Sequence, residues 1–100
     1  MKEVVIQEIR WDEWNKAHIW ERHQLTPEQV EEVCYGSPEH ILVEETHSKR
    51  LRIIGPKNDG KLLVVILAEE ASHTFYVVTA KPPKRQELRR YHTWKGETRE

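Results

Sequence analysis

The pattern of apolar and polar positions divides the chain into a helical first part, an extended middle and a helical end. Residues 4–10 alternate loosely and are rich in Val and Ile, which predicts a first strand that ends at Trp11. Asp12 is suited to cap a helix, which we expect over residues 13–23.

A sharper signal opens a second helix. Residues 26–29 (Thr-Pro-Glu-Gln) supply a capping hydroxyl, a proline at the first helical position and a Gln at the third, which together form a capping box. Val30, Val33 and Cys34 then recur at helical spacing, and Gly36 is expected to end the helix. Two short helices are therefore predicted after the first strand.

From residue 40 onward the pattern is typical of extended structure. A turn in which Gly60 takes a positive φ joins the second of four expected strands to the third. Residues 62–67 are apolar throughout, as in a central strand covered on both faces. The four expected strands occupy residues 40–45, 50–55, 61–68 and 73–80.

A basic, helix-like segment over residues 84–95 completes the order of elements. This order predicts an α+β fold, in which two N-terminal helices and one C-terminal helix pack on an antiparallel sheet. We expect one domain over residues 1–95 and a frayed tail at 96–100.

Charge is divided unevenly, although the formal net charge is only -1. Residues 1–46 carry 4 Lys or Arg against 11 Asp or Glu, whereas residues 47–100 carry 12 against 6. This asymmetry indicates a charged partner, or an acidic half that pairs with the basic half inside the fold. The single cysteine, Cys34, excludes an internal disulfide, and no long apolar run is present, so we expect a cytoplasmic protein without a membrane span.

Cations gather where the last expected strand passes into the last helix. Arg85, Arg89 and His92 lie at i, i+4 and i+7, next to an apolar stripe that can pack. With Lys81 at the strand end and Arg52 on an alternating strand, they could converge on a phosphate group. The alternative is a set of solvated surface charges paired with the acidic helices.

Six histidines raise the question of a metal site, but their spacing argues against one. His18 and His23 are five residues apart and point roughly 140° away from each other on a helix. We expect no metal and no cofactor. His23, at a helix end, is a candidate for proton transfer, with an interaction with the helix dipole as the alternative. Most of the four tryptophans are expected to be core residues or to hold the first helix against the sheet, with base stacking as the alternative.

Short motifs occur in a defined order over nearly the whole chain. They are Ile9-x-Trp11-Asp12, Arg22-His23-x-Leu25, Val33 before Pro38, Ile54-Gly55, Gly60-Lys61-x-Leu63-x-Val65, and Val78-Thr79-Ala80-Lys81 before Glu87 and Tyr91. In order and spacing they resemble the BrnT-type toxins of bacterial toxin–antitoxin systems. That resemblance implies a RelE-like fold and a metal-independent endoribonuclease, held inactive by a DNA-binding antitoxin protein. It leaves a homodimer open.

Cleavage of this kind needs a base that deprotonates the RNA 2′-hydroxyl, cations that stabilise the attacked phosphate, and an acid for the departing 5′-oxygen. Within the resemblance we assign His23 as the proton-transfer group and Arg52, Lys81 and Arg85 as phosphate and transition-state clamps. Joint replacement of Lys81 and Arg85 by Ala should abolish cleavage. The charges expected to bind the RNA backbone are Lys61, Lys84, Arg89 and Arg90.

The chain departs from the family pattern at four positions, which are Asn15, Ile19, Gln24 and Tyr76. These departures favour an alternative function, a toxin-fold module that binds an antitoxin or nucleic acid without cleaving it. A third alternative is a structural subunit whose acidic helices bind a basic partner, and it depends only on the charge of residues 1–46.

Overall fold

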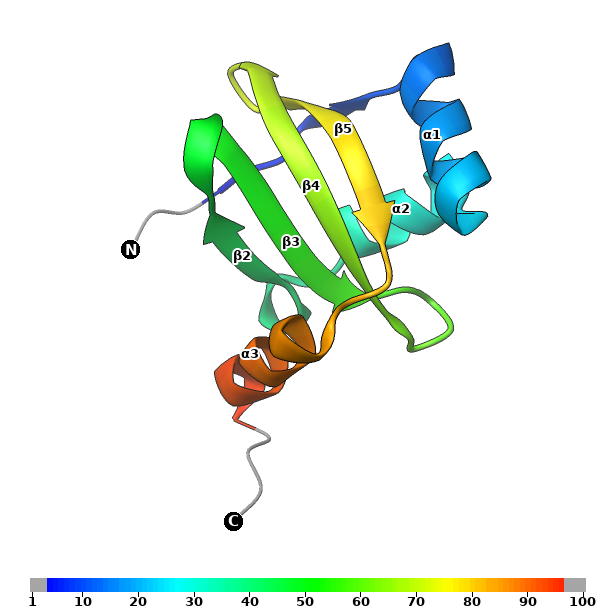
Figure 1. Cartoon of the computed structure of the whole chain (residues 1–100). Helices are drawn as coiled ribbons and strands as arrows, with labels where there is room; N and C mark the ends of the chain where they lie inside the picture. The colour runs from blue at the N-terminus through cyan, green and yellow to red at the C-terminus, as the bar shows by residue number, and fades with distance from the viewer. Residues whose placement is uncertain (1–3, 97–100) are drawn as a thin grey trace.

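Residues 4–96, the part of the chain that the computed structural model describes, form a five-stranded sheet with three α-helices (Figure 1). The strands lie in the order β1-β5-β4-β3-β2. They are β1 (Glu8–Arg10), β2 (Leu42–Glu45), β3 (Arg50–Pro56), β4 (Leu62–Ala71) and β5 (Thr74–Lys81). The helices are α1 (Glu13–His23), α2 (Pro27–Cys34) and α3 (Arg85–Lys95), with short 3-10 turns η1 (Pro38–His40) and η2 (His47–Lys49).

Both N-terminal helices begin at their predicted caps. The Asp12 carboxylate accepts the backbone N–H of Asn15 at 3.0 Å, and the Thr26 hydroxyl accepts that of Gln29 at 3.3 Å. In each case the reciprocal bond closes the capping box. The prediction for residues 13–23 is confirmed, and α2 ends at Cys34, two residues before Gly36. None of the helices within residues 4–96 has the length and apolar character needed to cross a lipid bilayer.

The predicted α+β class is confirmed, with one parallel strand pair in the sheet. β2, β3, β4 and β5 form antiparallel pairs, whereas β1 runs parallel to β5 at the sheet edge. The first strand is also shorter than predicted, because it begins only at Glu8. Val4 and Ile6 pack against the core instead of joining the sheet ladder. Of the predicted tail at 96–100, only Gly96 lies within the described residues.

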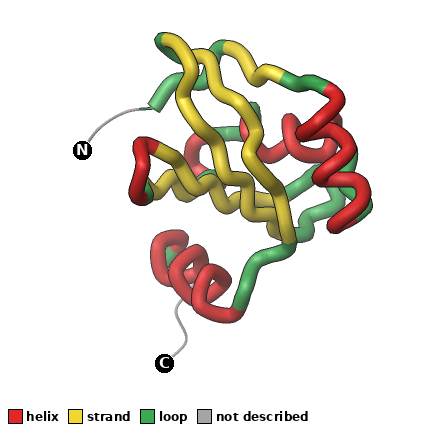
Figure 2. The backbone as a smooth tube through the Cα atoms, turned by 45° about the horizontal axis from the view of Figure 1, so that its top comes forward, coloured by secondary structure: helices red, strands yellow, loops and turns green. Residues whose placement is uncertain are grey.

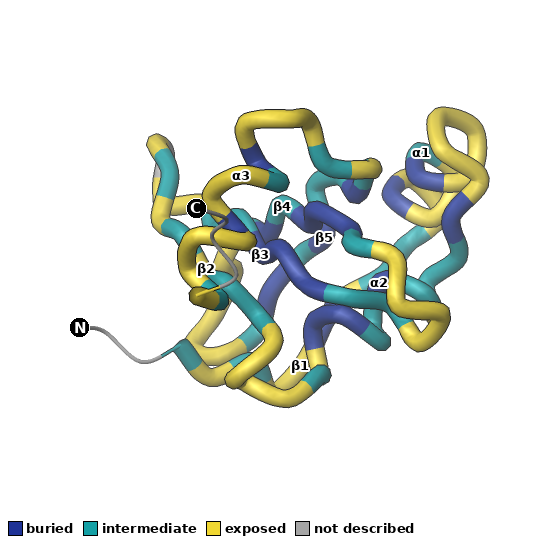
Figure 3. Tube along the Cα trace, turned by 90° about the horizontal axis from the view of Figure 1, so that it is seen from below, coloured by how far each residue is buried: buried dark blue, intermediate teal, exposed yellow. Residues whose placement is uncertain are grey.

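The two faces of the sheet are covered unequally. On one face, α1 and α2 contribute to the main apolar core, in which Ile19, Val33 and Val65 are fully buried. On the other face, Tyr91 of α3 packs on a smaller cluster with Ile54. Figure 2 shows α3 against one end of the sheet and well apart from α1, and Figure 3 shows burial concentrated on the strands. The second face is therefore covered only at the end where α3 lies.

The expectation that most tryptophans are core residues is wrong. Trp14 is 76% exposed, Trp20 55% and Trp94 42%. Only Trp11 is partly covered, and its indole N–H donates to Glu31 at 2.8 Å. The small core is filled by aliphatic side chains, and α1 lies at a sheet edge where it buries few residues. In contrast, Cys34 is in the core as predicted, and burial raises the pKa of its thiol to about 12.

Candidate functional site

A row of side chains crosses the sheet face that α3 covers only in part. Cross-strand pairing places Glu44 opposite Arg52, Arg52 opposite Ile66, and Ile66 opposite Thr79. α1 extends the row, because Nε2 of His18 lies 3.2 Å from Oγ1 of Thr79. A polar imidazole thus meets a hydroxyl on a partly exposed sheet surface.

A β-bulge shapes the β5 end of this row. Between the pairs Leu67–Val77 and Ile66–Thr79, β4 advances by one residue and β5 by two, so Val78 is the extra residue. Such a bulge bends the strand and redirects its side chains, and bulges are frequent next to active sites. Here the bulge leaves Val78 lining a pocket next to α1, while Thr79 still faces the same side as Ile66.

Asn15 fixes α1 against β5. Its side-chain amide donates to the backbone carbonyls of Arg10 at 3.1 Å and Val77 at 3.2 Å, and its oxygen accepts the N–H of Asp12 at 2.8 Å. The residue is 2% exposed. Because β1 pairs only with residues 74–76, the carbonyl of Val77 would otherwise lack a partner at this edge. Asn15 therefore joins β1, α1 and β5, and positions His18 one turn further along the helix.

Asn15→Ala is expected to lower the free energy of unfolding by about 1–3 kcal/mol, the cost of leaving buried polar groups without partners. Urea denaturation measures this as a lower midpoint at an unchanged slope. Asn15 lies in the first turn of α1, so Lys16→Ala, which removes an exposed side chain in the same turn, is the control. An Asn15→Ala midpoint equal to that of the control would contradict the role assigned to Asn15.

The arginines next to this row are held by two glutamates, the half-buried Glu44 and the buried Glu87. Nη1 of Arg52 donates to Glu44 at 2.9 Å, and its Nε lies 3.6 Å from Oε2 of Glu87. Arg90 donates to the same Glu44 at 2.8 Å. Burial alone would raise the pKa of the Glu44 carboxyl, but the hydrogen bonds from Arg90 and Arg52 outweigh it and hold this pKa below its usual value. Arg52 is thus part of the row, with its charge compensated.

Lys81 lies on the same face as Thr79, one pair further along β5. It pairs with Val64, whereas Thr79 pairs with Ile66. Same-face neighbours on a strand are about 6.6 Å apart along the chain. Within the described residues Lys81 forms no ion pair. Lys81 therefore offers an uncompensated positive charge next to the contact between His18 and Thr79.

The remaining predicted cations lie outside the row, and they are the clamp Arg85 and the RNA-binding residues Lys61, Lys84 and Arg89. Arg85 and Arg89 are exposed on α3, roughly 160° around the helix from the buried Glu87. Lys84 precedes α3, and its backbone N–H donates to Glu87 at 2.8 Å. Lys61 is exposed where the β3–β4 turn ends. The predicted separation of α3 into a packing side and a basic side is confirmed, since Tyr91 is buried and Arg85 and Arg89 are exposed. The catalytic role of Arg85 and the RNA-binding roles of the other three cations stay predictions.

The structure brings His18 to this surface and leaves His23 at the exposed last residue of α1. Five residues separate the two, which places them roughly 140° apart around the helix. The role predicted for His23 stays a prediction. One signal in the sequence could have found His18. Trp14, His18 and Arg22 are spaced four residues apart, so they lie on one side of the helix. That signal identifies a shared side, but not the strand it meets.

Each of the four departures from the family pattern has a structural role here. Ile19 is fully buried in the main core, and Asn15 bridges α1 to β5. Gln24 ends α1 at φ 55°, in the left-handed region where glycine is favoured. Tyr76 donates its hydroxyl to Asp12 at 3.1 Å. Asn15, Ile19 and Tyr76 therefore stabilise the placement of α1 on the sheet, whereas Gln24 ends the helix in a conformation that residues other than glycine rarely adopt.

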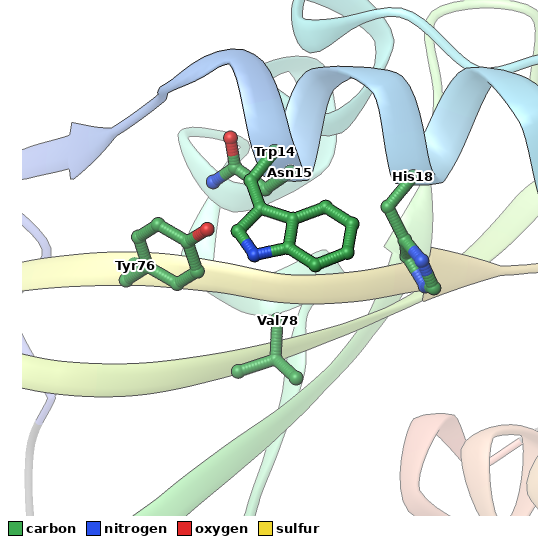
Figure 4. A pocket seen from close by; sticks show the side chains of 5 residues that line it. All are labelled: Trp14, Asn15, His18, Tyr76 and Val78. Carbon is green, nitrogen blue, oxygen red and sulfur yellow. The ribbon is translucent and has the colours of Figure 1, made fainter.

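Hollows lie on the surface of the described residues, and two of them border the elements described above. One of about 230 Å³ is lined by Trp14, Asn15, His18, Tyr76 and Val78 (Figure 4). A larger, mostly apolar one of about 900 Å³ follows the edge strand β2, between residues 4–6, the end of α2 and Trp94. Among residues 4–96, no three His, Cys, Asp or Glu side chains gather in a way that could hold a metal ion.

Comparison with known proteins relates this fold to one solved structure in particular. No protein-family model and no curated protein matches the sequence. The crystal structure of the Brucella abortus ribonuclease toxin BrnT matches with a TM-score of 0.62 at 22% sequence identity. The match covers 78% of this chain and 97% of the Brucella chain. In fold, the chain is therefore similar to a bacterial ribonuclease toxin.

Proposed function

We propose that this protein is the toxin of a toxin–antitoxin pair and cleaves RNA on the open face of its sheet, which is the face that α3 covers only in part. The observation that carries the proposal is the contact between His18 and Thr79, with Lys81 on the same face and no ion pair to that lysine among residues 4–96. An imidazole and an uncompensated cation on one face of the sheet suit a phosphodiester. The similarity in fold to the Brucella ribonuclease toxin supports the same conclusion.

In the proposed reaction the RNA 2′-oxygen attacks the adjacent phosphorus while its proton passes to a base. The bond from phosphorus to the 5′-oxygen breaks, and that oxygen takes up a proton. The products are a 2′,3′-cyclic phosphate and a 5′-hydroxyl. We assign proton transfer to His18, held by Thr79, and stabilisation of the phosphorane charge to Lys81. Arg52 lies two strands away on the same face, where it pairs with Glu44 and Glu87.

Incubation of the purified protein with single-stranded RNA tests this proposal. Cleavage is expected in the presence of EDTA, with products that end in a cyclic phosphate and a 5′-hydroxyl. A 2′-deoxy substitution at the cleaved position should block the reaction, because it removes the nucleophile. Products with 5′-phosphate ends, or cleavage that EDTA abolishes, would refute the mechanism.

A toxin-fold module that binds a partner without cleaving RNA is the second candidate. Two observations favour it. Arg52 and Arg90 share Glu44, which reduces the charge available for RNA. The apolar hollow along β2 lies at a sheet edge, and an uncovered edge can accept an added strand from a partner.

Expression in bacteria separates the two candidates. Growth arrest that a co-expressed antitoxin relieves is expected for the toxin, and the same arrest should be absent for His18→Ala. No arrest, together with stable binding of the antitoxin, would support the non-cleaving module.

A further inference from the structure

The smaller hollow on the open face lies next to an aromatic side chain that the fold does not use. Trp14 is 76% exposed, although it lies in the first turn of a helix whose other side is buried. In Figure 4 its indole lies over β5, between Tyr76 and His18. The indole has no ring partner, ion pair or hydrogen bond among the described residues. Packing therefore does not account for its position.

The hollow has the size and lining for a flat, uncharged ring. Its volume is about 230 Å³, and an apolar cavity of roughly 150 Å³ is enough to bind benzene. None of the residues that line it is Lys or Arg. The polar groups of Tyr76 and Asn15 are already engaged with Asp12, Arg10 and Val77. These properties suit an aromatic base better than a phosphate.

We propose that this hollow is the base-binding subsite of the ribonuclease, where one nucleobase of single-stranded RNA stacks on Trp14. The inference depends on the proposed function for the identity of the ligand. His18 links the two sites, because it borders the hollow and also contacts Thr79. A base held on Trp14 places its own sugar and phosphate next to the imidazole, while Lys81 faces the same surface. Stacking of this kind tolerates any base, so the subsite selects single strands and not a sequence.

Binding of an RNA analogue that cannot be cleaved tests the subsite independently of catalysis. The probe is a fluorescently labelled 2′-O-methyl oligouridine, and anisotropy gives its dissociation constant. Loss of one stacked base costs about 1–3 kcal/mol, so Trp14→Ala should weaken binding about 5- to 150-fold, at 1.4 kcal/mol per tenfold. Trp14→Phe keeps a ring and should retain most of the affinity.

Trp20→Ala is the matched control, because Trp20 is also exposed on α1 but lies roughly 120° around the helix from Trp14. The affinity of Trp20→Ala for the probe should stay within about twofold of that of the unchanged protein, because a surface substitution away from the site has a small effect. An abasic version of the probe should bind Trp14→Ala and the unchanged protein equally. Equal affinities of Trp14→Ala and Trp20→Ala, no binding of the probe at all, or a Trp14 effect that persists on the abasic strand would each overturn the subsite.

Failure of the subsite and failure of the ribonuclease proposal are distinguishable. If RNA cleavage depends on His18 but Trp14→Ala leaves probe binding unchanged, only the subsite proposal is refuted. If probe binding depends on Trp14 but the protein cleaves no RNA, only the catalytic proposal is refuted.

Discussion

His18→Ala is expected to reduce the rate constant of RNA cleavage by about 10²- to 10⁴-fold, the usual contribution of a positioned acid–base group. The reason is geometric. Thr79 holds Nε2 of the imidazole at 3.2 Å on the open face of the sheet, where a bound phosphodiester can reach it. Single-turnover cleavage of a labelled RNA measures the loss, because it separates chemistry from product release.

His23→Ala is the control for this measurement. His23 lies on the same helix, is exposed, and faces roughly 140° away from His18. If His23→Ala lost the activity and His18→Ala kept it, the prediction from sequence would stand and the assignment to His18 would be wrong. The urea midpoints of both variants should match that of the unchanged protein, which shows that α1 stays folded.

Lys81→Ala is expected to slow cleavage by about 10²- to 10³-fold, the effect of losing one preorganised group that stabilises transition-state charge. Lys81 faces the same side as Thr79 and has no ion pair among residues 4–96, so its full charge is available to the phosphate. The loss should appear in the rate constant of the chemical step more than in the affinity for RNA. Lys81→Arg, which keeps the charge, should recover part of the rate.

Arg85→Ala is the comparison for Lys81→Ala, because Arg85 lies on α3 and Lys81 lies on the strand that carries Thr79. Arg85 is exposed on the side of α3 away from Glu87, so its replacement should weaken RNA binding more than it slows the chemical step. A large loss of rate in Arg85→Ala with none in Lys81→Ala would contradict the placement of the site beside Thr79. If the joint replacement of both residues left turnover unchanged, neither cation would have a catalytic role.

Local signals in the sequence were enough to predict most of the secondary structure. The capping boxes at Asp12 and Thr26 depend on contacts within a single turn, and both are formed. The positive φ of Gly60 in the β3–β4 turn is local in the same way. The length of the first strand was not predictable, because Val4 and Ile6 have the alternation of a strand but pack on the core without joining the sheet.

The site was predicted only in part for a related reason. The alternation along β3 correctly puts Arg52 on a shared face, but the sequence does not reveal that Glu44 and Glu87 meet it there. Likewise, helical spacing places His18 on one side of α1 but cannot name Thr79 as its partner, 61 residues later. The exposure of Trp14 also depends on where α1 lies, since the same helix in the middle of the sheet would bury it.

The sequence by itself determined the helices, the order of the strands along the chain, the α+β class and the separation of α3 into a packing side and a basic side. These depend on interactions over a few residues and on burial periodicity. Only the tertiary structure decided that α1 lies along β5, that the bulge at Val78 opens a hollow there, and which histidine reaches the open face. Those features follow from the pairing of distant segments, which a linear pattern of residues does not encode.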